Sequence, residues 1–87
     1  MEAEKILVRR MLEDIARRLN KDKKIDWEGA YQDKYYIYLD TENDNMEYDS
    51  DIQCKTQGTI YCLDQDFLNV AKSEIGEERL KKYLRGE

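Results

Sequence analysis

Apolar residues near the start of the chain recur at the spacing of an amphipathic helix. Over residues 2–22 they form one stripe, which Ile6, Leu7 and Ala16 widen at its edges. Such a stripe faces a core, while charged residues occupy the other side of the helix. The pattern predicts a helix that ends at Asn20 and the lysine-rich run after it. The core-facing positions are Val8, Met11, Leu12, Ile15 and Leu19.

The middle of the chain changes to patterns that are typical of β-strands. Residues 34–41 contain a Tyr-Tyr-Ile-Tyr-Leu run, and residues 46–54 alternate between apolar and polar side chains. Residues 59–63 are again rich in β-formers, and residues 42–45 and 55–58 have the composition of turns. Because short turns join neighbouring antiparallel strands, we expect a three-stranded antiparallel meander.

The last third of the chain predicts two further helical segments. Asp64 or Asp66 suits the N-cap of a helix over residues 65–75. Gly76 breaks or kinks that helix. Residues 77–85 then form a short helix with acids at its start and bases at its end, as the helix dipole prefers.

Together these elements predict a single α+β domain over residues 1–87. Its order is α-β-β-β-α-α: a long N-terminal helix, a three-stranded antiparallel sheet, and one kinked or two short C-terminal helices. No apolar run approaches the roughly 20 residues of a membrane span. An amphipathic pattern also stands where an export signal needs an apolar run, so we expect a cytoplasmic protein without membrane contact.

Pairing the first two strands across the Asn43–Asp44 turn sorts their side chains between two faces. Leu39 then lies opposite Tyr48, and Tyr35 lies opposite Ile52. Side chains alternate along a strand, so a slip by one residue would exchange the faces. The predicted core face carries Tyr35, Ile37, Leu39, Met46, Tyr48 and Ile52. The predicted outer face carries Tyr36, Tyr38, Asp40, Glu47, Asp49 and Asp51, with Tyr61 and Leu63 from the third strand.

Charge is distributed unevenly along this framework. Eleven acidic residues and two lysines lie between Asp26 and Asp66, with the only Trp and six of the seven Tyr; the net charge of the chain is −5. Like charges two positions apart on a strand lie about 6.7 Å apart and repel, so a basic partner would relieve them. This predicts a partner-binding surface; the alternative is an acidic surface that only serves solubility. The candidate binding residues are Tyr36, Tyr38, Asp40, Glu42, Glu47, Asp49, Asp51 and Tyr61.

Residue types that commonly carry catalysis are scarce. The chain has no histidine, which is the usual general base at neutral pH. Cys54 and Cys62 therefore have no histidine to activate them, and they are too few for a zinc site. We expect no enzyme activity and no cofactor. Both cysteines fit free, half-buried thiols, while a disulfide across the hairpin remains the alternative.

A calcium loop is the metal site that the sequence approaches most nearly. Asp40, Glu42, Asp44 and Asp51 occupy positions 1, 3, 5 and 12 of a twelve-residue loop. Asn45 stands where an EF-hand needs Gly, and a strand precedes the loop where a helix should. We therefore predict no specific metal site, with loose binding of divalent cations by the acidic cluster as the alternative.

The first helix has a basic side formed by Arg9, Arg10, Arg17 and Arg18. The simplest interpretation is a solvated helix face. The alternative is a contact with nucleic acid, which the acidic middle of the chain disfavours. Trp27, in the connector after this helix, is expected to close one edge of the core.

Three stretches carry a resemblance to known proteins: Lys-Tyr-Tyr-Ile-Tyr-Leu-Asp at 34–40, Gly-Thr-Ile-Tyr at 58–61, and Glu-Ile-Gly-Glu-Glu-Arg-Leu-Lys-Lys-Tyr-Leu at 74–84. They resemble small accessory proteins encoded by phages and prophages of Firmicutes. This resemblance implies a bacterial cytoplasm and a mobile-element origin. In size, acidity and expected element order, the chain is also similar to some anti-CRISPR proteins, which block a basic nucleic-acid channel by imitating the charge of DNA.

The predicted function is that of a non-enzymatic, protein-binding inhibitor of phage or prophage origin, such as an anti-CRISPR or other anti-defence protein. Its acidic, tyrosine-rich sheet face would block a basic nucleic-acid-binding surface. The expected partner is a host protein or ribonucleoprotein complex, without direct contact to nucleic acid. The alternative is a self-associating structural or regulatory phage module, a homodimer that pairs through the tyrosine face or the first helix.

Overall fold

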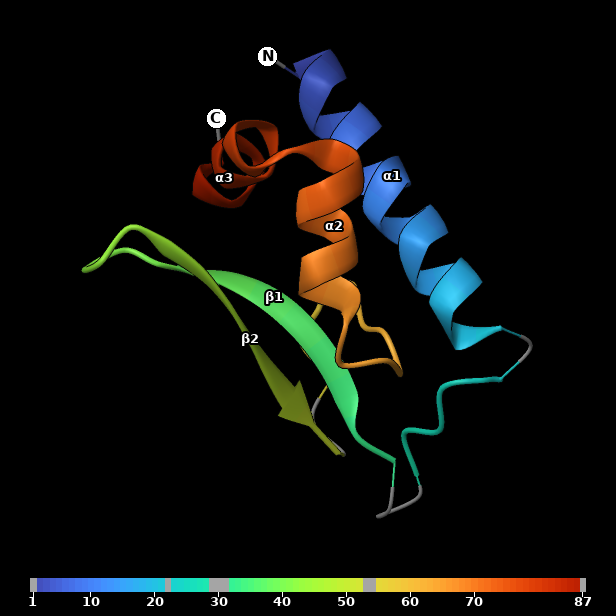
Figure 1. Ribbon diagram of the computed structural model, residues 1–87. Coiled ribbons are helices and arrows are strands. Elements are labelled where there is room, and N and C mark those ends of the chain that lie inside the picture. The colour runs from blue at the N-terminus through green and yellow to red at the C-terminus, as the bar shows by residue number, and fades with distance from the viewer. Residues whose placement is uncertain (1, 22, 29–31, 53–54, 87) are drawn as a thin grey trace.

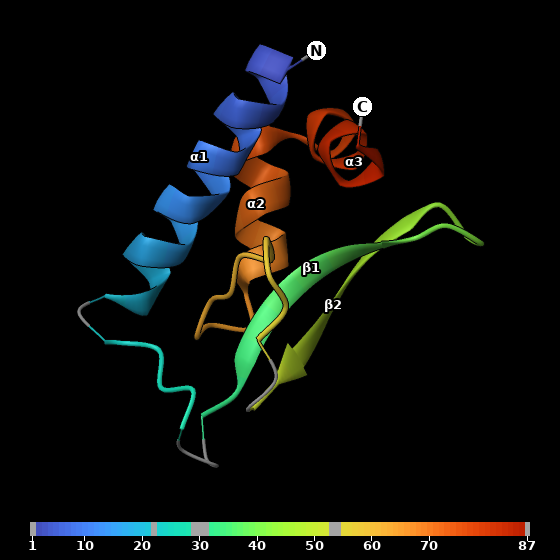
Figure 2. The ribbon, with the colours of Figure 1, turned by 180° about the vertical axis from the view of Figure 1, so that it is seen from behind.

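The computed structural model describes residues 2–21, 23–28, 32–52 and 55–86. Within these residues the chain forms three helices and a two-stranded antiparallel sheet. The elements are α1 Glu2–Asn20, β1 Lys34–Asp40, β2 Asn45–Asp51, α2 Phe67–Ile75 and α3 Glu77–Arg85. The helices lie together on one side of the β1–β2 hairpin, so a helical layer covers one face of the sheet (Figure 1 and Figure 2).

The α1 helix confirms the predicted amphipathic pattern and turns its apolar stripe to the core. Ile6 and Leu7 are each 47% exposed, so they lie outside the stripe that they were expected to widen. Asn20 ends the helix, and its side-chain oxygen accepts a hydrogen bond from Leu63 N–H at 2.7 Å. This bond ties the end of α1 to the segment before α2. The buried residues of α1 are Val8, Leu12, Ile15 and Ala16.

The β1–β2 hairpin has a different register from the predicted one. Leu39 lies opposite Met46, two residues away from the predicted pairing. The turn explains the shift, because the Asp40 carboxylate accepts hydrogen bonds from Glu42 N–H (3.1 Å) and from the Asn43 side chain (2.9 Å). The turn therefore begins directly after Asp40. Since strand side chains alternate, a shift of two residues leaves them on their predicted faces.

The prediction of a third strand over residues 59–63 is wrong. In the structure a single bridge joins Cys62 to Tyr35, through N–H···O bonds of 2.7 and 2.9 Å. The N–H of the segment's first residue bonds to Thr56 O within a turn (3.2 Å), and that of its last residue bonds to the Asn20 side chain (2.7 Å). These partners take backbone groups that a longer ladder would need, so the described sheet has two strands.

The α2 and α3 helices complete the core against the inner side of the hairpin. The α2 helix begins two residues later than predicted, because Asp64 accepts a hydrogen bond from Asp66 N–H (2.9 Å) in a turn before it. Gly76, with φ of 97°, separates the two helices as predicted, and α3 has the predicted bounds. The core consists of Val8, Leu12, Ile15, Ala16, Met46, Cys62, Phe67, Leu68, Ala71, Ile75 and Leu80.

Candidate functional site

The sheet face opposite the helices, which we call the outer face, gathers most of the predicted binding residues. Tyr36 lies opposite Asp49, and Tyr38 lies opposite Glu47, in the β1–β2 register. Directly opposite residues of an antiparallel pair share a face, so these rings and carboxylates are neighbours. The outer face carries Lys34, Tyr36, Tyr38 and Asp40 from β1 and Asn45, Glu47, Asp49 and Asp51 from β2.

An aromatic cluster covers part of the outer face. The Tyr61 ring lies 5.8 Å from the Tyr36 ring and 4.8 Å from the Trp27 ring, between centroids. Tyr61 is 6% exposed, and its hydroxyl accepts a hydrogen bond from Thr56 N–H at 2.9 Å. Tyr61 thus packs edge-on beside Tyr36 and, being buried, offers little contact area itself. Trp27 lies against this cluster, on the outer face, and not at the edge of the core where it was predicted.

Lys34 is a buried residue of the outer face that the sequence did not single out. Its ammonium donates hydrogen bonds to the backbone oxygens of Gln32 (2.8 Å) and Ile52, and it lies 5.0 Å from the centroid of Trp27. The ammonium is therefore directed at backbone oxygens and an indole ring. The sequence offered one signal that Lys34 belongs to the outer face: it lies two positions before Tyr36, and therefore on the same side of the strand.

Glu47, Asp49 and Asp51, which we call the acidic row, extend along the outer side of β2. Glu47 and Asp49 are exposed, and Asp51 is half-buried. Within the described ranges, no lysine or arginine forms an ion pair with any of the three. The Asp49 carboxylate accepts a local hydrogen bond from Ser50 N–H at 2.8 Å. The acidic row therefore presents a concentrated negative charge to solvent.

The carboxylates of the hairpin turn have structural partners instead. Asp44 pairs with Arg85 (2.7 Å) and Lys81 (3.5 Å) of α3, and the hydrogen bond from Arg85 lowers the pKa of Asp44. The hydrogen bond from the Asn43 side chain lowers the pKa of Asp40 in the same way. Both side chains thus hold the turn, while Glu42 is exposed at its tip.

Tyr36 is the ring whose ionisation the outer face changes. Burial raises the pKa of Tyr36, and the charges of Asp49 and Asp51 raise it further. Tyr38, the next ring along the same side of β1, is 40% exposed, with 6.1 Å between the two ring centroids. The outer face thus combines neutral rings with an acidic row, which is chemistry for binding cations and polar surfaces.

Metal and thiol chemistry find little support in the described part of the chain. No three His, Cys, Asp or Glu side chains lie close enough together there to hold a metal ion. Asp44, one of the four acidic residues at calcium-loop spacing, is directed at α3. Cys62 is a free thiol that is fully buried, and burial raises its pKa. Cys54 lies outside the described residues.

The basic side of α1 is largely engaged by other residues. Arg9 donates to Gly58 O (2.9 Å), and Arg17 and Arg18 both bind Asp14 (2.6 and 3.1 Å), with Arg18 also reaching Glu74. These contacts support the interpretation as a structural and solvated face over the nucleic-acid alternative.

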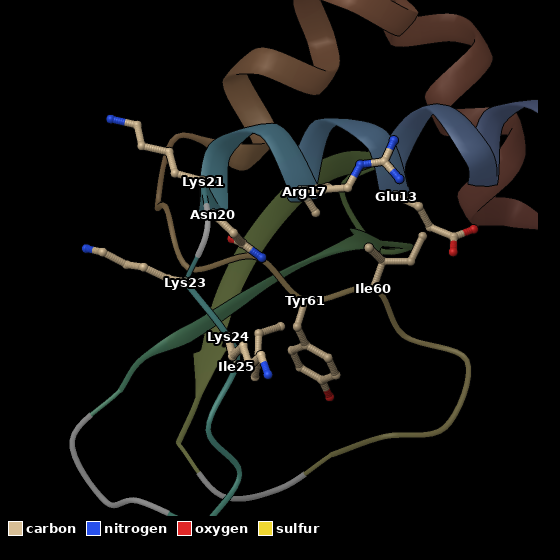
Figure 3. A pocket seen from close by; sticks show the side chains of 10 residues that line it. Glu13, Arg17, Asn20, Lys21, Lys23, Lys24, Ile25, Ile60 and Tyr61 are labelled. Atoms are coloured by element: carbon tan, nitrogen blue, oxygen red, sulfur yellow. The ribbon is translucent and has the colours of Figure 1, made fainter.

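An open hollow of about 580 Å³, with Arg17 at its wall, lies between the end of α1, residues 23–25 and Tyr61. Lys21, Lys23 and Lys24 contribute to its wall. Figure 3 shows the Lys21 and Lys23 side chains extending away from Tyr61 towards solvent. Two of the four basic residues that line the hollow therefore point out of it, which does not favour an anion site there.

Neither a membrane-spanning helix, among the described residues, nor a known relative was found. Within the ranges given above, no helix combines the length and the apolarity needed to cross a membrane. No protein-family model, curated protein or solved structure matches the chain.

Proposed function

We propose that this protein is a non-enzymatic inhibitor whose outer face covers a basic, phosphate-binding surface of another protein. The observation that carries the proposal is the acidic row: three carboxylates on one side of one strand, without an ion pair to a described lysine or arginine. A surface that normally holds phosphates offers dense positive charge. Opposite charges of this kind steer association and determine which partner is bound.

The tyrosines of the outer face supply the uncharged part of such an interface. Tyr38 is 40% exposed beside Glu47, and the Tyr36 ring packs against the buried Tyr61 ring. Rigid aromatic side chains lose little conformational entropy on binding and are enriched at protein interfaces. The acidic row would therefore select a basic partner, and the rings would add packed contact area.

The proposed setting is the cytoplasm of a bacterial host, with a phage or prophage as the source of the protein. It rests on the resemblance of the segments at 34–40, 58–61 and 74–84 to phage accessory proteins. In that setting the partner is a host protein or ribonucleoprotein complex of a defence system, such as a CRISPR effector with its guide. The inhibitor would occupy the basic channel and would not itself bind nucleic acid.

Affinity capture tests this proposal directly. Tagged protein is incubated with a purified CRISPR effector–guide complex and eluted with a salt gradient. We expect retention at low salt and release at moderate salt, because surface charge pairs are screened over about 10 Å at 0.1 M salt. Glu47→Lys with Asp49→Lys should weaken capture by about tenfold or more.

Matched variants separate local charge from net charge. Glu2→Lys with Glu78→Lys makes the same change of net charge on exposed helix positions away from the outer face. If both double variants lose capture equally, net charge alone is responsible. If neither loses it, the outer face is not the binding surface.

A self-associating module is the second candidate. The observation that favours it is the exposure of two apolar residues on the helix-side face of the hairpin, Tyr48 (46%) in β2 and Ile52 (41%) directly after it. Light scattering after size-exclusion chromatography distinguishes the two functions. A mass that rises with protein concentration, and falls after Tyr48→Ser, would favour the homodimer.

A further inference from the structure

The outer edge of β2 has backbone groups without a strand partner. Both backbone groups of Tyr35 bond to Cys62, so they point away from β2. Backbone groups alternate in direction along a strand. The backbone groups of Tyr36 and Tyr38 therefore point towards β2, where they lie opposite Asp49 and Glu47 of the acidic row. The N–H and C=O groups of Met46, Tyr48 and Ser50 consequently point to the open side. In the described part of the chain, no segment pairs with that side.

The side chains along this edge differ between the two faces. The acidic row lies on the outer face, and the exposed apolar residues Tyr48 and Ile52 lie on the other. A strand added at this edge would meet carboxylates with every second side chain and apolar surface with the others. Such a strand would also cover Tyr48, which is 46% exposed.

We propose that the β2 edge binds an extended partner segment in which basic and apolar residues alternate. The inference deepens the proposed function and rests on it, because the same acidic row selects the partner. Lysines or arginines would lie opposite Glu47, Asp49 and Asp51, and apolar residues would lie opposite Tyr48. The backbone bonds at Met46, Tyr48 and Ser50 would set the register, as in other cases of strand addition.

Asp49 provides a device that protects the free edge. Its carboxylate accepts the Ser50 N–H bond, which is one of the donors that a new strand would need. Exposed edges in native proteins are commonly shielded from indiscriminate pairing by charged side chains. A basic residue of the incoming segment would draw the Asp49 carboxylate away and release this N–H. Segments without that charge would leave the Ser50 N–H occupied by Asp49.

A second copy of this chain is a poor occupant of the same edge. Antiparallel pairing of β2 with itself about a two-fold axis places the two outer faces on the same side. The acidic rows would then lie directly opposite each other, and such like-charge pairs destabilise a sheet. The edge therefore selects a basic segment over self-association.

Two fluorescent peptides test the inference. One is Lys-Val-Lys-Ile-Lys-Val-Lys, and the other has the same residues in the block order Lys-Lys-Lys-Lys-Val-Ile-Val. We expect the alternating peptide to bind at least about tenfold more tightly in fluorescence anisotropy, at low salt. Tyr48→Pro removes an outward N–H, and should abolish this preference. Tyr48→Ala retains the N–H and serves as the matched control.

Backbone methylation gives a second test that leaves the protein unchanged. Alternating peptides methylated at the nitrogens that face β2 should lose binding, whereas methylation at the other nitrogens should not. If alternating and block peptides bind equally well and methylation has no effect, the proposal that the β2 edge adds a strand is wrong. That result would still allow the outer face to bind a partner through charge alone. The strand-addition proposal would also be wrong if the Lys variants of the acidic row lose effector capture while Tyr48→Pro captures the effector as well as Tyr48→Ala does. If the effector is not captured but the alternating peptide binds tightly, the proposed partner is wrong and the proposed binding of a strand at the β2 edge stands.

Discussion

Lys34 carries a charge into the interior of the protein at the start of β1. Its side chain is 0% exposed, and its ammonium is held by two backbone oxygens and the Trp27 ring. Burying a charge is costly unless hydrogen bonds replace those of water. Cation–π contact adds to this stabilisation. Lys34 therefore links the connector, β1 and the end of β2 around one group.

We predict that Lys34→Met destabilises the protein although methionine fills a similar volume. The substitution leaves the backbone oxygens of Gln32 and Ile52 without the ammonium, and an unsatisfied buried group costs about 1–3 kcal/mol. The free energy of unfolding in urea measures the loss. Lys55→Met is the control, because Lys55 also lies near Trp27 (5.8 Å) but is exposed. Equal effects of the two changes would show that burial of Lys34 contributes nothing special.

At the scale of elements, Gly76 sets the angle between α2 and α3. Its φ of 97° and ψ of 142° lie in a region that residues with a side chain rarely adopt. Gly76→Ala should therefore cost about 1–3 kcal/mol of unfolding free energy. A Cβ at this position would meet no atom within 4 Å, so the cost comes from the backbone conformation alone. Ser73→Ala, at an exposed position of α2, should leave the urea midpoint nearly unchanged, and a similar loss in both would contradict this assignment.

The elements that follow from local pattern were predictable, and those that depend on distant partners were not. The period of apolar residues located α1, and Gly76 located the break between α2 and α3. The period of two also placed each strand side chain on its face despite the wrong register. The third strand failed because Asn20, far away in sequence, bonds to the backbone at the end of that segment.

The candidate site shows the same division. The composition and alternation of β2 were sufficient to place the acidic row on one face. The burial of Tyr61 and Lys34 was not predictable, because it depends on how the connector brings Trp27 against the sheet. The structural role of Asp44 was equally hidden, since it depends on where α3 places Arg85.

For the whole molecule, we predict acid sensitivity without a transition near neutral pH. The chain has no histidine, and hydrogen bonds from basic or amide side chains lower the pKa of Asp14, Asp40 and Asp44. A carboxyl group with a lower pKa in the folded state stabilises the protein above its unfolded pKa of about 3.9. That contribution is lost as the pH falls through the folded pKa. The urea midpoint should therefore be level from about pH 5 to pH 8 and should decrease below about pH 4.

Asp44→Asn checks the origin of this decrease. The variant should be less stable than the parent at neutral pH, because it loses the charge that pairs with Arg85 and Lys81. It should also lose less stability on acidification, so the two proteins converge at low pH. Parallel curves for parent and variant would show that the Asp44 carboxylate does not contribute to the acid limb.

The acidic row should cost the isolated protein stability if it exists for a partner. Glu47→Gln with Asp49→Asn removes two like charges and retains an acceptor oxygen for Ser50 N–H. We expect an increase of about 0.2–1 kcal/mol in unfolding free energy at low salt, because the like-charge repulsion disappears. The gain should shrink in about 1 M salt, where the Debye length falls to about 3 Å.

The same variant should lose capture of a basic partner, which would separate binding from folding. A loss of stability at low salt would instead make these carboxylates structural and remove the main support for the binding surface. If the acidic row serves to bind a basic partner, the double variant should gain stability and lose binding at the same time.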